Sequence, residues 1–170
     1  MAMEFKQFVF NSFQVNLTLV TLNRKSILFD APCNSKKELQ QIDDYLNSAN
    51  SLLCAIVLTH AHIDHIVGCK QIQDKYNVPI YVHTDDLFLF NTAPQMAEMF
   101  GFKWESAPEV EHVLNTENEL TIEGINFKCF HVPGHSPGSL VYYFETDKKL
   151  IAGDVLFNGS IGRTDLPGGD

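Results

Sequence analysis

Histidine and aspartate side chains gather in one short segment, Thr59-His-Ala-His-Ile-Asp-His65. His60 and His62 stand two positions apart, so in extended chain both imidazoles point the same way and can bind one cation. Asp64 and His65 follow where we expect a helix to begin, and they can reach a second cation nearby. An apolar run precedes the segment, and a buried strand there would project these side chains into one cleft. The pattern predicts a metal centre rather than a solvated His-rich loop.

Two later segments supply the donors that this centre still needs. Val132-Pro-Gly-His-Ser-Pro-Gly138 holds His135 between Pro and Gly residues, which fix the backbone around its ring. Ile151-Ala-Gly-Asp154 ends an apolar strand in a carboxylate, and the preceding glycine leaves room for close approach to a ligand. Alone, these segments indicate a turn with a surface histidine and a capping aspartate. Together with the first segment, they offer a third imidazole for one metal and a carboxylate that can bridge two.

The first half of the sequence mixes strands and helices. Ser35 and Glu38 have the spacing of a capping box, and the apolar run 52–58 is too short for a lone helix and predicts a strand buried on both faces. By apolar periodicity and turn residues we expect three antiparallel strands within 5–30, further strands at 52–58 and 79–83, and helices over 37–49, 66–76 and 84–101, the last interrupted at Pro94.

From Glu119 onward the pattern predicts strands alone, at 119–122, 125–132, 139–145 and 149–153. A sheet with an apolar outer face must be covered by another element, and the sequence offers none after these strands. We therefore expect residues 1–170 to form a single domain that lacks the C-terminal part of a longer chain.

The order H-x-H-x-D-H, then P-G-H-S-P-G, then G-D resembles the metallo-β-lactamase fold superfamily over nearly the whole chain. The resemblance implies an α/β (α+β) fold, a four-layer αββα sandwich with a two-metal site at one edge of its sheets. Its last helical layer would be missing here. One departure is Asp30-Ala-Pro-Cys33, where the superfamily often has D-P-G, and this would alter a turn near the site.

The resemblance also implies a role for each residue of the three segments. Metal 1 would be held by His60, His62 and His135, metal 2 by Asp64 and His65, and Asp154 would bridge the two. The superfamily draws one more histidine for metal 2 from a downstream P-G-H-G sequence, which this sequence lacks. Imidazole and carboxylate ligands without thiolate favour Zn²⁺ at both sites but also accept Fe or Mn. His83, His112 and His131 have no part in the motif and are expected to be structural or surface residues.

Two bound cations would lower the pKa of a bridging water and give a metal-bound hydroxide at neutral pH. In this interpretation Asp64 is the catalytic residue, because it orients the hydroxide and passes its proton to the leaving group.

The Gly-Arg-Thr-Asp sequence that ends at Asp165 resembles the glyoxalase II-like and persulfide dioxygenase-like branches. Arg163, Thr164 and Asp165 would then support the site, or an Arg–Asp pair would pin a loop. The resemblance implies a metal-dependent hydrolase of thioesters such as hydroxyacyl-glutathione. Two alternatives stay open: a persulfide dioxygenase-like oxidoreductase with a single iron, and a non-catalytic remnant of the fold.

Composition limits the partners. Twelve Lys and Arg against 21 Asp and Glu give a net charge of −9, which argues against binding nucleic acid or an anionic membrane. The small-molecule substrate is what the resemblance implies. No apolar run reaches a membrane span and no signal peptide is recognisable, so we expect a cytoplasmic protein. Cys33, Cys54, Cys69 and Cys129 are far apart and indicate buried thiols rather than disulfides. The oligomeric state stays open.

Overall fold

Two β-sheets face each other and share a core in the computed structural model, which describes residues 2–115, 118–166 and 168–170. The larger sheet has the order β1-β2-β3-β4-β5-β6, antiparallel from β1 to β3 and parallel from β3 to β6. Its strands are β1 (Glu4–Phe10), β2 (Val15–Leu22), β3 (Lys25–Phe29), β4 (Leu52–Val57), β5 (Ile80–His83) and β6 (His112–Leu114).

The second sheet is antiparallel throughout, with the order β10-β9-β8-β7. Its strands are β7 (Asn118–Ile122), β8 (Ile125–His131), β9 (Leu140–Phe144) and β10 (Lys149–Ile151), and a short hairpin of β11 (Leu156–Phe157) and β12 (Ser160–Ile161) follows. Phe29 from the first sheet packs against Phe127 and Tyr142 from the second, with ring centroids 5.5 and 5.1 Å away. These aromatic contacts hold the two sheets together.

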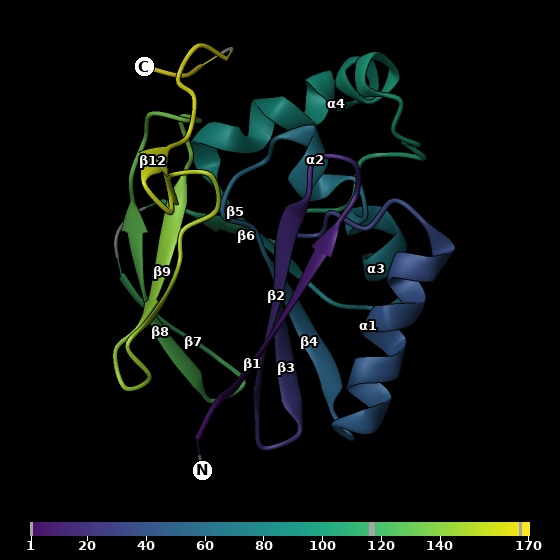
Figure 1. The fold of residues 1–170 in the computed structure, drawn as a ribbon, viewed down its shortest axis with the longest axis vertical. Helices are drawn as coiled ribbons and strands as arrows, with labels where there is room; N and C mark the ends of the chain where they lie inside the picture. Colours follow the sequence, from purple (N-terminus) through teal and green to yellow (C-terminus); the bar gives the residue numbers. More distant parts are fainter. Residues whose placement is uncertain (1, 116–117, 167) are drawn as a thin grey trace.

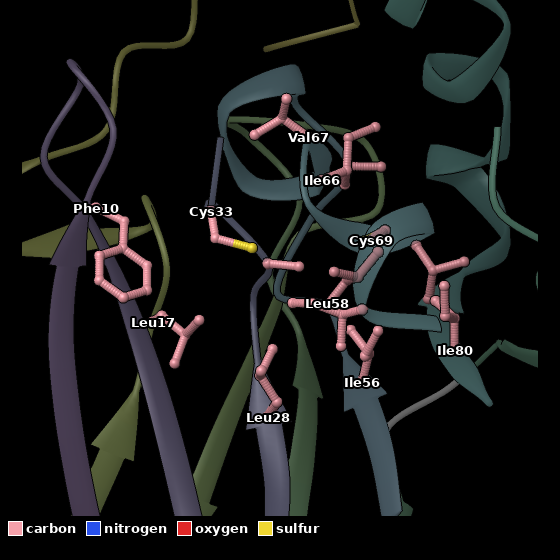
Figure 2. Packing of buried hydrophobic residues seen from close by; sticks show 14 of the residues in the cluster. Phe10, Leu17, Leu28, Cys33, Ile56, Leu58, Ile66, Val67, Cys69 and Ile80 are labelled. Carbon is pink, nitrogen blue, oxygen red and sulfur yellow. The ribbon is translucent and has the colours of Figure 1, made fainter. Parts of the chain in front are cut away.

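The helices cover the other face of the larger sheet and its upper end. They are α1 (Lys36–Ser48), α2 (Ile63–Ile66), α3 (Cys69–Tyr76) and α4 (Leu87–Phe100), the last preceded by a 3₁₀ turn over Thr84–Asp86. In Figure 1, α1 and α3 lie beside the larger sheet, and α4 runs across the top of the view. Figure 2 shows the core beneath them, where Leu28 and Ile56 from the strands meet Ile66 and Cys69 from the helices.

The Ser35 half of the capping box is confirmed, because the Ser35 side chain accepts a hydrogen bond from the Glu38 N–H at the start of α1. The Glu38 carboxylate accepts from the Asn34 N–H instead of the Ser35 N–H. The expected break at Pro94 is wrong: α4 continues through it. Proline removes one backbone donor from a helix, but α4 buries Leu89, Phe90, Ala93 and Ala97, and this packing holds the helix together across the missing bond.

The sequence did not predict β6, β11 or β12, which are only two or three residues long. The prediction that β4 is buried on both faces is wrong at its start, because the Leu52 side chain is 73% exposed. The strand becomes fully buried only as it approaches the His-rich segment.

The outer face of the second sheet carries exposed apolar side chains, among them Phe130 and Leu150. Within the described ranges no helix follows β10. None of the helices in these ranges is long and apolar enough to cross a membrane.

Candidate metal centre

The three segments that carry the predicted metal ligands meet at one end of the two sheets. His60 and His62 lie in the loop after β4, and Asp64 and His65 lie in α2, whose first residue follows that loop directly. His135 comes from the β8–β9 loop, and Asp154 follows β10. The sheet-to-sheet packing therefore brings together residues that are up to 94 positions apart in the chain (60 to 154).

Three imidazoles form the first donor group. The ligand atoms of His60, His62 and His135 all lie within 4.8 Å of one another. The closest pair is His62 Nδ1 and His135 Nε2, 2.9 Å apart. The His60 ring lies 4.8 Å, centroid to centroid, from each of the other two rings.

A second donor group shares His60 and adds His65 and Asp154, again within 4.8 Å. His65 Nε2 lies 3.3 Å from Asp154 Oδ1, and the other carboxylate oxygen of Asp154 lies 3.6 Å from His135 Nε2. Asp154 thus stands between the two groups, where a bridging ligand would have to be.

Asp64 is the one predicted ligand that belongs to neither group. Its Oδ2 lies 3.8 Å from His65 Nε2, and it lines the same cavity as His62, His135 and Asp154. The Asp64 carboxylate therefore lies beside the two donor groups and is not a member of either.

The donor atoms fit a divalent cation. The Nε2 atoms of His60 and His65 are buried and have no hydrogen-bond partner, and such atoms carry a large desolvation cost unless something binds them. On the opposite side, His135 Nδ1 donates to the Arg163 carbonyl at 2.7 Å, and His65 Nδ1 lies 3.0 Å from Asp30 Oδ2. Rings held at one nitrogen and open at the other are the usual arrangement of metal-binding histidines.

Burial keeps the imidazoles of His60 and His62 neutral, which is the form that binds a metal. Burial lowers the pKa of His62 to about 3, and burial followed by the neighbouring imidazoles places the pKa of His60 well below its usual value. His65 differs: burial lowers its pKa, but Asp30 and Asp154 outweigh this and raise it well above the ordinary value.

Asp30 is a supporting residue that the sequence indicated only as part of an altered turn. Its side chain accepts hydrogen bonds from the Thr59 N–H at 2.7 Å and the Thr59 hydroxyl at 2.8 Å, and it contacts His65 Nδ1. It sits directly after β3 in the left-handed region, with φ of 58°. One carboxylate therefore fixes both the start of the His-rich segment and the orientation of His65.

Asp86 is a second supporting residue, and the sequence indicated it only as part of a helix start. It is fully buried and accepts hydrogen bonds from the Ala61 N–H at 2.8 Å, the Gly138 N–H at 2.6 Å and the Ser136 hydroxyl at 2.9 Å. A Cβ on Gly138 would lie 2.7 Å from the carboxyl carbon of Asp86, so only glycine allows this approach. Asp86 thus ties the segment of His60 and His62 to that of His135.

The Gly-Arg-Thr-Asp sequence supports the site through its backbone. The Arg163 carbonyl accepts the His135 hydrogen bond, while the Arg163 guanidinium pairs with Asp165 at 2.6 and 2.7 Å on the surface. Thr164 is exposed.

The three remaining histidines lie outside the donor groups. His83 and His131 stack with ring centroids 4.0 Å apart, and His131 Nε2 donates to the Pro137 carbonyl at 2.7 Å. Their donor atoms approach Asp85 within 4.8 Å, but stacked, nearly parallel rings do not aim their lone pairs at one point. His112 is exposed and stacks on Tyr81.

A cavity of about 590 Å³ opens beside the donors. His62, Asp64, His135 and Asp154 form one part of its wall, and α4 supplies much of the rest through Phe88, Met96 and Phe100. Its size is that of a small-molecule site.

Comparison with known proteins agrees with this geometry. The chain is 31% identical over 169 residues to the probable metallo-hydrolase YqgX of Bacillus subtilis, spanning 99% of this chain and 78% of that protein. It is 35% identical to the hydroxyacylglutathione hydrolase GloC of Haemophilus influenzae, spanning 94% of this chain and 74% of that protein.

Solved structures give the same result. The B3 metallo-beta-lactamase BLEG-1 superposes with a TM-score of 0.85 at 34% identity, over 98% of this chain and 79% of that one. TTHA1623 in a di-iron-bound form superposes with a TM-score of 0.81 at 31% identity, over 97% of this chain and 79% of that one. The model of the metallo-beta-lactamase superfamily matches residues 11–170. Sequence, fold and the convergence of histidines from distant loops agree that the chain belongs to the metallo-β-lactamase superfamily.

Proposed function

We propose that this chain is a metal-dependent hydrolase of thioesters, such as a hydroxyacyl-glutathione. The observation that carries the proposal is the gathering of His60, His62, His65, His135 and Asp154 into two donor groups, of which His62, His135 and Asp154 line a small-molecule cavity. The similarity to a hydroxyacylglutathione hydrolase supports the choice of thioester.

In this proposal His60, His62 and His135 would hold one cation and His65 and Asp64 would contribute to a second, while Asp154 lies between the two donor groups. Zn²⁺ suits a set of imidazoles and carboxylates without thiolate. The di-iron form of TTHA1623 shows iron in that relative, so elemental analysis of the purified protein decides the metal. When bound, the cations would polarise the thioester carbonyl and lower the pKa of a bound water.

The chain's own residues would do the rest. Asp64 lies at the cavity wall next to His62, so its carboxylate can accept the proton of the attacking water and pass it to the departing thiolate. Asp30 and Asp86 hold the donor segments in register through the hydrogen bonds described above. Water adds across the acyl C–S bond, and the products are a carboxylic acid and a thiol.

The test is hydrolysis of lactoyl-glutathione, measured as the loss of thioester absorbance. We expect a chelator to abolish this hydrolysis and added Zn²⁺ to restore it. The Asp64→Asn substitution should lower kcat/KM at least about a hundredfold. A metal-replete protein that hydrolyses none of a broad thioester panel would falsify the proposal.

The single-iron persulfide dioxygenase and the non-catalytic remnant stay predictions. Oxygen consumption by the iron-loaded protein with glutathione persulfide would favour the first. A protein that binds no divalent metal would favour the second.

We also propose that residues 1–170 form one domain, supported by the core that both sheets share. A cytoplasmic location is proposed because Cys33 and Cys69 are buried as thiols.

A further inference from the structure

The cavity beside the donors is lined by an unusual number of exposed apolar side chains. Thirteen large apolar side chains are exposed in the described part of the chain, and five of them line this one cavity: Phe13, Phe88, Met99, Phe100 and Phe157. Exposed apolar groups scattered singly are ordinary, but a gathered set marks a binding surface.

These side chains come from three separate parts of the fold. Phe13 lies in the β1–β2 turn, Phe88 and Phe100 lie at the two ends of α4, and Phe157 belongs to β11. Phe13 and Phe100 meet edge to face with ring centroids 5.3 Å apart. The apolar wall therefore forms only when these three parts fold together, and it is not simply the apolar face of one amphipathic helix.

The charges of the cavity complement an apolar rather than an ionic occupant. Among the described lining residues, the one Lys or Arg is Arg163, and its guanidinium is already paired with Asp165. Thiol carriers such as glutathione and coenzyme A are polar and anionic. The wall offers their charges no unpaired cation, so the part of a thioester that matches it is the acyl group.

We propose that this cavity is an acyl-binding site and that the substrates are thioesters whose acyl group carries an apolar chain or ring. The proposal rests on the proposed thioester hydrolysis and specifies its substrate class. The scissile carbonyl lies at His62, Asp64, His135 and Asp154, which form the polar part of the wall. The apolar group extends from there along α4, against Phe88 and Phe100.

The test is a series of glutathione thioesters that differ only in acyl length: lactoyl, 2-hydroxybutanoyl, 2-hydroxyhexanoyl and 2-hydroxyoctanoyl. Full burial of one methylene gives roughly a fourfold gain and half-burial roughly a twofold gain, so the three extra methylenes of hexanoyl should raise kcat/KM about eightfold over lactoyl even when each is only half buried. In a second series, which keeps one acyl group and changes the thiol, kcat/KM should vary much less than in the acyl series.

Two wall variants test the residues. Phe88→Ala and Phe100→Ala should each lower the hexanoyl-to-lactoyl ratio of kcat/KM at least about threefold, and both side chains are exposed, so folding should tolerate the change. Phe130→Ala is the matched control, because Phe130 is a comparably exposed phenylalanine on β8 that does not line the cavity. Its ratio should equal that of the parent.

The outcomes separate the two proposals. Hydrolysis of lactoyl-glutathione with no gain along the series overturns the acyl site and leaves the proposed function intact. Hydrolysis of no thioester overturns both. Binding of 2-hydroxyoctanoate no tighter than lactate, measured by calorimetry, also contradicts the acyl site without depending on turnover. A dimer that Phe88→Ala and Phe100→Ala dissociate, with a flat series, would show that a second copy covers this wall.

Discussion

His62 Nδ1 lies 2.9 Å from His135 Nε2, although 73 residues separate them in the chain. Two nitrogens so close must share a cation or a proton, and the buried, unpartnered Nε2 atoms around them favour the cation. We predict that His135→Ala weakens Zn²⁺ binding at least about a hundredfold, measured by competition with a fluorescent chelator. His112→Ala is the control, because His112 is exposed on β6. Equal affinities in the two variants would contradict the assignment.

Replacement of Asp86 should loosen the centre without touching a donor. In Asp86→Asn one carboxylate oxygen becomes an NH₂ group, which must face an N–H or hydroxyl donor from Ala61, Gly138 or Ser136. Leaving such a buried group unpaired costs about 1–3 kcal/mol. We expect the free energy of unfolding in urea to fall by that amount and metal affinity to fall about tenfold or more.

The neighbouring residue provides the control for that experiment. Asp85→Asn changes the same functional group, but the Asp85 side chain is half exposed and accepts none of these three bonds. We expect a change within about 0.5 kcal/mol. If both variants lose stability equally, the loss at Asp86 does not come from its bonds to the two loops.

The buried His83 should make stability depend on pH. Burial, followed by the nearby His131, lowers the pKa of His83 below its ordinary value of 6.5. The unfolded chain therefore takes up a proton at a higher pH than the folded chain does. As the pH falls below about 6.5, the free energy of unfolding should fall, by at most about 1.4 kcal/mol per pH unit for this one residue.

His83→Asn isolates this contribution. In the parent, His83 Nδ1 accepts a hydrogen bond from the Asp85 N–H at 3.2 Å. The asparagine side chain can also accept this bond, but asparagine does not titrate. The difference in unfolding free energy between parent and variant should shrink from pH 7 to pH 5 in urea titrations. A difference that stays constant over this range would show that His83 is not held neutral by the fold.

The four thiols should differ sharply in reactivity. Burial raises the pKa of Cys33 to about 12, which at pH 8 leaves roughly one thiolate in ten thousand, and Cys69 and Cys129 are also buried. Cys54 is only partly buried. We expect iodoacetamide to modify Cys54 first in the native protein, as peptide mass analysis would show, and Cys54→Ser to remove most native labelling. Rapid labelling of Cys33 would contradict the packing around α2.

Local patterns predicted most of the elements. The helix start at Ser35 and the short strand β4 were both predicted from signals that neighbouring residues carry, and both were found. The interruption at Pro94 was wrong because tertiary packing of α4 outweighs a local preference. Strands as short as β6 have too few residues to show a period.

The donors of the candidate site could be found from sequence because each stands in a compact segment. The residues that support them could not. Asp30 and Asp86 act on backbone N–H groups 29 and 25 positions away, and a backbone donor leaves no mark in the sequence. The apolar wall of the cavity has the same origin, since Phe13 and Phe100 become neighbours only in the folded chain.

The donors are divided between the two sheets, since His60, His62 and His65 follow a strand of the larger sheet and His135 and Asp154 follow strands of the smaller. Any cation bound among them is a cross-link that thermal unfolding must break. At a free Zn²⁺ concentration a hundred times Kd this linkage adds about 2.7 kcal/mol, or a rise in Tm of roughly 5–10 °C. Calorimetry with and without chelator should show that rise, and in the chelated protein the two sheets should separate more readily, as faster amide exchange along β8 and β9 would report.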